Sequence, residues 1–320
     1  MNYFEKYTGF FRSLKLTYIL NNLLNYSNLK KNESLYKKLG VKKKVWQPIS
    51  SKDFIENNSE MPWLDRENAM ELLLNSNQYN EFDETHKLKL KQWVENGFLV
   101  LENFFDGKLI DNVNEEVEQL IKEGKLGFNF TGRKIMFAHK QSAAVDKLFR
   151  DKKLIELFEF ILGKKVKPFQ TINFIYGSEQ KAHSDSIHMS TQPPGYLIAA
   201  WIALEDIKEG SGELHYYSGS QKLSYIMSDD FQSGNTYFTI GKDFYKRYEE
   251  EIKKRIEKSK IQKQTFLAKK GDVLIWHANL LHGGEPVINK TLTRKSQVCH
   301  YFAEDVICYH EITQRPAVIS

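Results

Sequence analysis

Two histidine-containing segments, far apart in the chain, constrain its fold more than any other feature. The first holds His183, Ser184 and Asp185, and the second holds His282. Alternate side chains of a strand point to the same side, so we expect His183 and Asp185 to share a direction while Ser184 turns away. Two imidazoles and one carboxylate are the ligands that hold non-haem Fe(II) on one face and leave other positions open. We therefore expect the fold to bring His282 beside the first segment; His277, at an odd offset from His282, would face away on a regular strand.

An arginine and a serine follow His282 at a distance that suits a cosubstrate clamp. Arg294 and Ser296 are two residues apart, so on a strand they share a face. A guanidinium binds a carboxylate through a two-pronged fork, and a hydroxyl beside it adds a further donor. This pair is suited to the distal carboxylate of 2-oxoglutarate.

Longer runs of sequence resemble a known family. They are WVENGFLVLENFF at 93–105, AWIALED at 200–206, GEL at 212–214 and the segments around His282 and Arg294. Over 83–302 the chain resembles the phytanoyl-CoA dioxygenase family of Fe(II)/2-oxoglutarate-dependent oxygenases. The resemblance implies a double-stranded β-helix, oxidative decarboxylation of 2-oxoglutarate with O2, and a place for Trp201 near the cofactor pocket. The family's Pro-Gly-Ser-His turn reads Ser-Gly-Ser-Gln here, at 218–221.

The hydrophobic pattern predicts helices first and strands afterwards. Helices are expected over 67–74, 85–96, 107–123 and 143–162, the last broken near Asp151. Strands are expected at 98–101, 169–176, 196–204, 213–217, 264–268, 272–276 and 297–303. This order predicts a mainly β jelly roll (cupin-like) behind a helical layer. We expect a helical, basic extension and linker at 1–82 and the oxygenase domain at 83–320. An insertion at 224–263 carries a helix over 242–261 that is either a solvated helix or a lid.

The positive charge is concentrated at the start of the chain. Residues 1–50 hold ten Lys and Arg and two Glu, a net charge of +8, whereas the whole chain carries +5. The remaining part is near neutral, which argues against a nucleic-acid-binding core. Apolar residues from Phe10 to Leu24 recur at helical spacing. Residues 1–50 are therefore an amphipathic extension packed on the core or on a second subunit, or a basic segment that contacts a membrane surface or an anionic partner.

The cysteine content and the lack of long apolar runs indicate a compartment. Cys299 and Cys308 form no metal motif and no disulfide framework, which fits a reducing cytoplasm. We see neither a signal-peptide pattern at 1–27 nor an apolar stretch near the roughly 18 residues of a membrane span. With 41% hydrophobic residues, the sequence is typical of a globular protein.

These features predict an enzyme that hydroxylates an aliphatic C–H bond and releases succinate and CO2. The substrate is expected to be a small molecule, a lipid or a sugar intermediate. Asp185 favours hydroxylation over halogenation, because the related halogenases have a small residue at that position. Desaturation, epimerisation and ring closure remain open, as does a non-catalytic, metal-containing jelly-roll binding module; the oligomeric state is not predicted. Candidate substrate contacts are Arg133, Gln170, Asn173, Tyr176 and His188, while His215, His277 and His300 are expected to be structural or pocket-lining.

Overall fold

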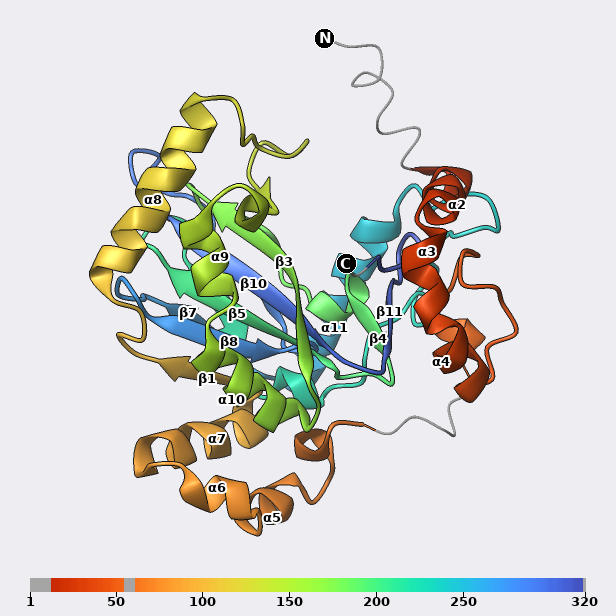
Figure 1. The fold of residues 1–320 in the computed structure, drawn as a ribbon, viewed down its shortest axis with the longest axis horizontal. Helices are drawn as coiled ribbons and strands as arrows, with labels where there is room; N and C mark the ends of the chain where they lie inside the picture. Colours follow the sequence, from red (N-terminus) through yellow and green to blue (C-terminus); the bar gives the residue numbers. More distant parts are fainter. Residues whose placement is uncertain (1–12, 55–60, 319–320) are drawn as a thin grey trace.

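A six-stranded antiparallel sheet forms the centre of the molecule (Figure 1). The structure is a computed structural model and describes residues 13–54 and 61–318. In spatial order the strands are β1 (Phe98–Leu101), β8 (Val273–His277), β5 (Leu197–Ala203), β10 (Ser296–Ala303), β3 (Val166–Phe174) and β2 (Ile135–Met136). β10 is central, because Val298 pairs with Trp201 of β5 on one side and with Ile172 of β3 on the other. The five predicted strands in this sheet are confirmed; β2 is additional.

A second, three-stranded sheet faces the inner side of the first. Its order is β7 (Lys263–Phe266), β6 (Leu214–Tyr217) and β9 (His282–Gly284). An apolar layer that includes Trp201, Trp276, Leu214 and Phe266 fills the space between the two sheets. Side chains alternate along each strand, so alternate residues of β5, β8 and β10 face this layer. The two facing antiparallel sheets form the predicted double-stranded β-helix.

Helices cover the outer face of the six-stranded sheet. They are α7 (Glu84–Asn96), α8 (Gly107–Lys122), α9 (Ala143–Phe149) and α10 (Lys152–Leu162), with α5 (Ala69–Leu74) and α6 (Asn77–Glu81) below α7 (Figure 1). The predicted break near Asp151 is present, because the Asp151 side chain accepts a hydrogen bond from Leu154 N at 3.0 Å and caps α10. A large apolar core joins these helices to the outward residues of the sheet, such as Ile198, Ile275 and Tyr301.

The N-terminal segment stands to one side of the sheets. It contains α2 (Lys15–Leu24), α3 (Tyr26–Leu29) and α4 (Glu33–Lys38). It packs on a third small sheet of β12 (Arg315–Pro316), β11 (Ile307–His310) and β4 (Ser190–Gln192), through Leu29, Tyr36, Ile307 and Tyr309. The helical prediction for 1–50 is confirmed over these elements, and its part at 1–12, with Phe10 and Phe11, lies outside the described residues.

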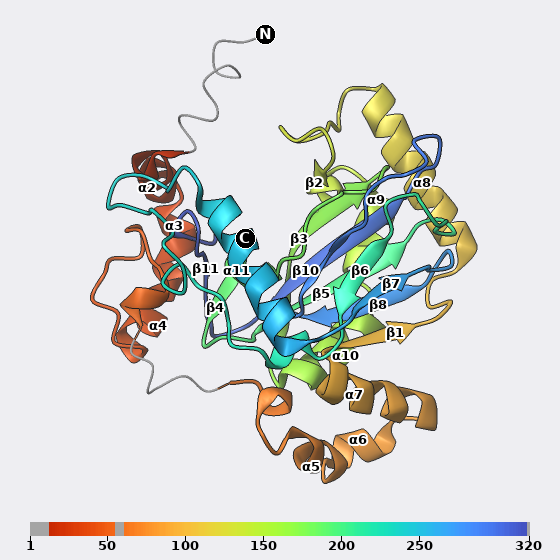
Figure 2. The same cartoon turned by 180° about the vertical axis from the view of Figure 1, so that it is seen from behind.

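The predicted insertion helix is present as α11 (Phe244–Ser259), on the side of the sheets opposite α10 (Figure 2). Phe244, Tyr248 and Ile252 pack on Ile187 and Leu281. Ile187 comes two residues after Asp185, and Leu281 comes directly before His282. Short 3-10 helices complete the chain: Lys30–Asn32, Ser51–Asp53, Trp63–Asp65, Ala138–Lys140, η6 (Asp185–Ile187) and Ser220–Lys222. No helix in the described ranges is both long and apolar enough to cross a bilayer.

Candidate metal centre

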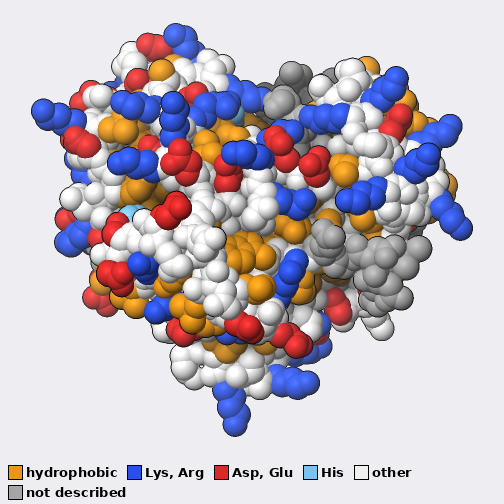
Figure 3. Space-filling model, turned by 60° about the horizontal axis from the view of Figure 1, so that its bottom comes forward, with side chains coloured by type: hydrophobic (Ala, Val, Ile, Leu, Met, Phe, Trp, Pro, Cys, Tyr) orange, Lys and Arg blue, Asp and Glu red, His pale blue; other side chains and the backbone are white. Residues whose placement is uncertain are grey.

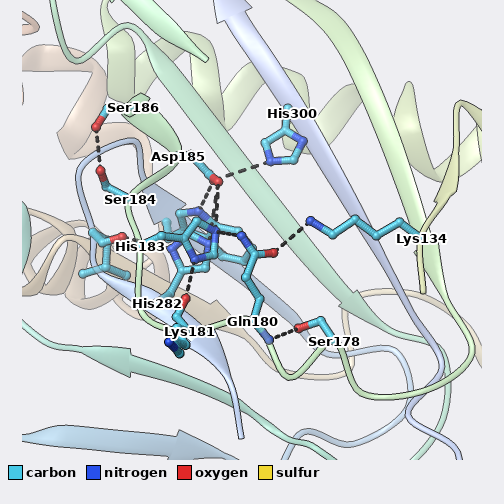
Figure 4. A network of polar contacts seen from close by, with 12 residues as sticks. Lys134, Ser178, Gln180, Lys181, His183, Ser184, Asp185, Ser186, His282 and His300 are labelled. Carbon is cyan, nitrogen blue, oxygen red and sulfur yellow. Dashed lines mark hydrogen bonds and ion pairs between the residues drawn. The ribbon is translucent and has the colours of Figure 1, made fainter. Parts of the chain in front are cut away.

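The fold brings His183, Asp185 and His282 together, although they come from distant segments. One ligand atom of each lies within 4.8 Å of the others, and all three residues are buried. His183 and His282 form an isolated β-bridge, in which His183 N donates to His282 O and His282 N donates to His183 O, both at 2.9 Å. The expected regular strand through His183 and Asp185 is wrong, because Asp185 begins η6. The turn into η6 still aims the Asp185 carboxylate at the two imidazoles (Figure 4).

Backbone carbonyls fix the orientation of both imidazoles. His183 Nδ1 lies 2.9 Å from Lys181 O, and His282 Nδ1 lies 3.0 Å from Leu280 O. A carbonyl only accepts, so each Nδ1 carries the hydrogen and each Nε2 keeps a lone pair. Burial lowers the pKa of both histidines, that of His183 to well below its ordinary value. Both are therefore neutral near pH 7 and can bind a metal through Nε2.

The two oxygens of Asp185 have different surroundings. Oδ1 lies 3.9 Å from His183 Nε2 and 3.7 Å from His282 Nε2. Oδ2 accepts a hydrogen bond from Trp276 Nε1 at 2.8 Å and lies 3.4 Å from His300 Nε2. Burial alone would raise the pKa of Asp185, but His282 and the hydrogen bond from His300 hold it well below its ordinary value. The carboxylate is therefore ionised, with Oδ1 available to a cation.

Gln180 and Lys134 extend this polar network toward the cavity. Gln180 Nε2 lies 3.0 Å from His183 Nε2, and Lys134 Nζ donates to Gln180 Oε1 at 2.8 Å (Figure 4). The His183 Nε2 lone pair can serve one partner, so a metal there would replace the Gln180 contact. Burial lowers the pKa of Lys134, and Asp185 opposes that shift.

Arg294 is buried in the layer between the two sheets. Its guanidinium carbon lies 4.9 Å from the Phe174 ring centroid and 5.9 Å from that of Trp201. Nε donates to Gly212 O at 3.2 Å, and Nη1 donates to Ser296 Oγ. Burial lowers the pKa of Arg294 to about 10, so it remains charged at pH 7.

The polar groups around Arg294 are left incomplete. No carboxylate forms an ion pair with this guanidinium in the described part of the chain. The buried Trp201 Nε1 likewise has no hydrogen-bond partner among the described residues. Buried charges and donors are normally paired, so this site fits a carboxylate ligand.

A cavity of about 960 Å³ opens beside this cluster, and His183 and Asp185 line it. Of the predicted substrate contacts, Arg133, Gln170 and His188 line it, whereas Asn173 and Tyr176 do not. Asn173 is buried and donates to Gln297 Oε1 at 3.3 Å, and Tyr176 is on the surface. On a regular strand the odd offset between His183 and His188 would turn His188 away from the site. The helical turn of η6 removes that alternation, and the His188 ring centroid lies 5.7 Å from that of His183.

Three further histidines were expected to be structural or pocket-lining: His215, His277 and His300. His277 faces away from the site, and its Nε2 lies 3.0 Å from Asp65 Oδ2. A turn at 278–281 separates it from His282, so its direction is set by β8 and not by a strand shared with His282. His215 Nδ1 lies 3.2 Å from Glu285 Oε1. His300, beside Asp185, is pocket-lining as expected, but its contact with the carboxylate was missed.

This contact could have been found from the sequence. His300 is separated from Arg294 and Ser296 by even intervals, so the alternation that pairs those two residues also places His300 on their face. The role of Gln180 had no comparable signal, because it lies in an irregular segment.

A double-stranded β-helix with two histidines and one carboxylate at its open end defines the class of non-haem iron oxygenases. The model of the family described as "Phytanoyl-CoA dioxygenase (PhyH)" matches residues 93–296, and the chain belongs to this family. The human protein "Phytanoyl-CoA dioxygenase, peroxisomal" is 28% identical over 242 residues, which cover 67% of this chain and 68% of the relative.

Solved structures support the same fold. EctD from S. alaskensis, solved with 2-oxoglutarate and 5-hydroxyectoine, has a TM-score of 0.56 and 19% identity over 80% of this chain and 86% of its own. The α-ketoglutarate-dependent carbocyclase SnoK from nogalamycin biosynthesis has a TM-score of 0.55 and 12% identity over 73% and 88%. The family match, the fold and the cluster of two histidines and one carboxylate together show that the protein is an Fe(II)- and 2-oxoglutarate-dependent dioxygenase.

Proposed function

We propose that the protein hydroxylates an aliphatic C–H bond of a small, amphipathic anion. The lining of the cavity carries this proposal. Six basic side chains line it: Arg133, Lys134, Lys140, Arg150, Lys167 and Arg315. Asp185 is the one acidic residue among the described residues that line it. The cavity also has apolar walls, which suit the apolar part of an amphipathic substrate. They include Phe137, Phe149, Phe169, Phe302, Met136 and Ile172.

The basic side chains are only partly neutralised from outside the cavity. Three of the six form ion pairs: Arg133 Nη2 lies 2.5 Å from Glu179 Oε2, Arg150 Nε lies 2.9 Å from Asp146 Oδ1, and Lys167 Nζ lies 3.3 Å from Glu304 Oε1. Lys134 donates to an uncharged amide, and Lys140 lies 5.1 Å from the Phe137 ring centroid. The cavity therefore keeps a positive potential that favours a carboxylate, phosphate or sulfate group. Among the small molecules, lipids and sugar intermediates expected, this lining favours an acidic lipid or a similar amphipathic acid.

We assign His183, Asp185 and His282 as the iron ligands, through Nε2, Oδ1 and Nε2. Arg294 and Ser296 would hold the distal carboxylate of 2-oxoglutarate, with Trp201 Nε1 as a further donor. When bound, iron and 2-oxoglutarate supply the oxidation: one atom of O2 enters succinate as CO2 leaves, and the other enters the C–H bond. The protein orients the substrate and limits access of water to the site.

Cofactor binding is tested by anaerobic titration with Fe(II) and 2-oxoglutarate, followed by the visible charge-transfer band. We expect a band in the wild type, none in His183→Ala, and a requirement for far more 2-oxoglutarate in Arg294→Ala. A band of normal intensity in His183→Ala would refute the ligand assignment.

Substrate class is tested by succinate release with matched pairs of aliphatic acids and their neutral methyl esters or alcohols. We expect the acids to stimulate turnover and to gain one oxygen atom, and Lys140→Met to raise their KM. Lys122→Met, on the exposed side of α8, is the control. Equal stimulation by neutral and acidic partners would refute an anionic substrate, and loss of two hydrogens would replace hydroxylation by desaturation.

The compartment is also part of the proposal. Cys299 and Cys308 are both buried and free. Two unpaired thiols support a reducing environment such as the cytoplasm.

A further inference from the structure

The helix α2 is amphipathic, but its polar face is turned toward the protein and its apolar face toward solvent. Its buried residues are polar: Lys15 and Asn22 are 2% and 1% exposed. Lys15 Nζ donates to Gln314 Oε1 at 2.8 Å and to Thr236 O, and Asn22 Nδ2 donates to Trp46 O at 3.0 Å. A surface helix normally turns its apolar stripe toward the core. The inner face of α2 is instead attached by hydrogen bonds.

The outer face of α2 is a stripe of four leucines. Leu16, Leu20, Leu23 and Leu24 are 60%, 56%, 46% and 86% exposed. At 100° per residue these four positions lie on one side of the helix. Single exposed leucines are ordinary, but a contiguous stripe on one helix marks an interaction surface. We call these four residues the leucine stripe.

The segment that follows the leucine stripe is rich in exposed lysines. From Ser13 to Ser50 the chain holds eight lysines and one glutamate, a net charge of +7. The six exposed lysines are Lys30, Lys31, Lys37, Lys38, Lys42 and Lys44. In Figure 3, lysine and arginine side chains are prominent at the right edge, the side on which α2–α4 lie in Figure 1.

A hollow of about 810 Å³ joins the leucine stripe to the lysines. Leu23 and Tyr26 line one part of it, and Lys37, Lys43 and Lys44 line another. Lys43 is paired with Asp53 at 2.8 Å. Glu33, the one acidic residue among those that line the hollow, accepts a hydrogen bond from Tyr26 OH at 2.8 Å. Lys37 and Lys44 make no ion pair with any residue that the structure describes.

We propose that the leucine stripe and the adjacent hollow form a docking surface for a bilayer that contains anionic phospholipids. The leucines would enter the boundary between headgroups and acyl chains, and Lys37 and Lys44 would contact the lipid phosphates. Charge decides against a second copy of the chain as the occupant, because two segments of net charge +7 would repel each other. Asn21 of the same helix lines the active-site cavity, so a docked bilayer would lie beside that cavity.

Co-sedimentation of the full chain with vesicles tests this proposal without any need for activity. We expect binding to vesicles of phosphatidylcholine with phosphatidylserine, little binding to phosphatidylcholine alone, and release at high salt. The double change Leu20→Glu and Leu24→Glu should abolish binding, and Leu88→Glu, an exposed leucine of α7 that is 57% exposed, should not. Each of Lys37→Gln and Lys44→Gln should weaken the partition about fivefold, and Lys258→Gln at the end of α11 is the charge control.

Three results would overturn the proposal. They are a wild type that stays in solution with anionic vesicles, binding that survives the two leucine changes, and equal weakening by Leu88→Glu. The wild type could instead be a dimer in sedimentation equilibrium that does not bind vesicles. If the two leucine changes convert that dimer to a monomer, the leucine stripe is a contact between copies of the chain. Circular dichroism verifies that each variant is folded. None of these readouts depends on the metal, so a failure here leaves the proposed chemistry untouched.

Discussion

Trp276 donates its indole N–H to Asp185 Oδ2 at 2.8 Å, on the side of the carboxylate turned away from the two histidines. This bond leaves Oδ1 as the oxygen nearest His183 and His282. A group that holds one carboxylate oxygen fixes the direction of the other, and such supporting bonds tune metal affinity strongly. The inner face of β8 therefore helps to set the geometry of the proposed iron site.

Replacing Trp276 by Phe removes this donor and keeps an aromatic ring. We expect Fe(II) affinity to fall about 10- to 100-fold, because the carboxylate is no longer held. The measurement is anaerobic Fe(II) titration of the apoprotein. Trp63→Phe is the matched control, since it removes an indole bond of 2.9 Å to Phe160 O away from the site. Equal affinities of Trp276→Phe and the control would refute the supporting role.

Arg294→Lys separates charge from geometry in the carboxylate clamp. Lysine keeps the positive charge but cannot form the planar fork. A hydrogen bond to a charged group contributes about 1.5–3 kcal/mol, so we expect the Kd for 2-oxoglutarate to rise about 10- to 100-fold. Fe(II) affinity in the absence of 2-oxoglutarate should be unchanged. An unaltered Kd would mean that Arg294 acts only as a buried charge.

Gly212 offers a steric test of the same clamp. Its φ is +87°, its carbonyl accepts from Arg294 Nε at 3.2 Å, and an added Cβ would lie 2.8 Å from Val287 Cγ2 and 2.9 Å from Gly177 Cα. Gly219 has a similar φ of +84°, but nothing lies within 4 Å of an added Cβ. Gly219→Ala should cost about 1 kcal/mol of stability from backbone conformation alone.

Gly212→Ala should cost a further ~1–3 kcal/mol from overpacking, and it should weaken 2-oxoglutarate binding. Urea unfolding and 2-oxoglutarate titration of the two variants provide the comparison. Equal losses of stability in both variants would show that the close approach of the Gly177 and Gly212 backbones is unimportant.

Lys15 makes the stability depend on pH. Burial is the main cause that lowers its pKa from 10.5 to about 8, and Lys43 adds to the effect. Between pH 8 and pH 10.5 the unfolded chain holds a proton on Lys15 that the folded chain has lost. The free energy of unfolding of the wild type, relative to Lys15→Met, should therefore rise with pH across this window and stay level below it. Urea unfolding at several pH values measures the difference, and a constant difference would contradict the shifted pKa.

The sequence predicted residue identity at the site better than local conformation. The spacing of His183 and Asp185 pointed to a shared direction, which the structure shows, but a 3-10 turn and not a strand produces it. His277 faces away from the site, as predicted. The prediction assumed one regular strand through His277 and His282, whereas the chain turns between β8 and β9. Both outcomes depend on contacts between distant segments, which a local pattern cannot report.

The fold was predicted where elements are long and was missed where they are short. Helices such as α8 and strands such as β5 carry enough apolar residues to show their period. The strands β4, β9 and β12 have two or three residues each, and they exist because a partner strand lies beside them. The reversed orientation of α2 was also invisible, since a helical period does not state which face meets the core.

The position of β10 has a consequence for how this protein can vary. Arg294 N donates to Ile175 O at 2.8 Å, and Ser296 and His300 pair with both β3 and β5. Arg294 and Ser296, the proposed carboxylate clamp, and His300, which lies beside Asp185, are thus on one chain segment. Their spacing is set by the repeat of that segment, which pairs with a strand on each side. A slip of that segment by one position would turn all three side chains outward together. Substitutions in the surrounding core can therefore reshape the cavity while the spacing of Arg294, Ser296 and His300 stays constant.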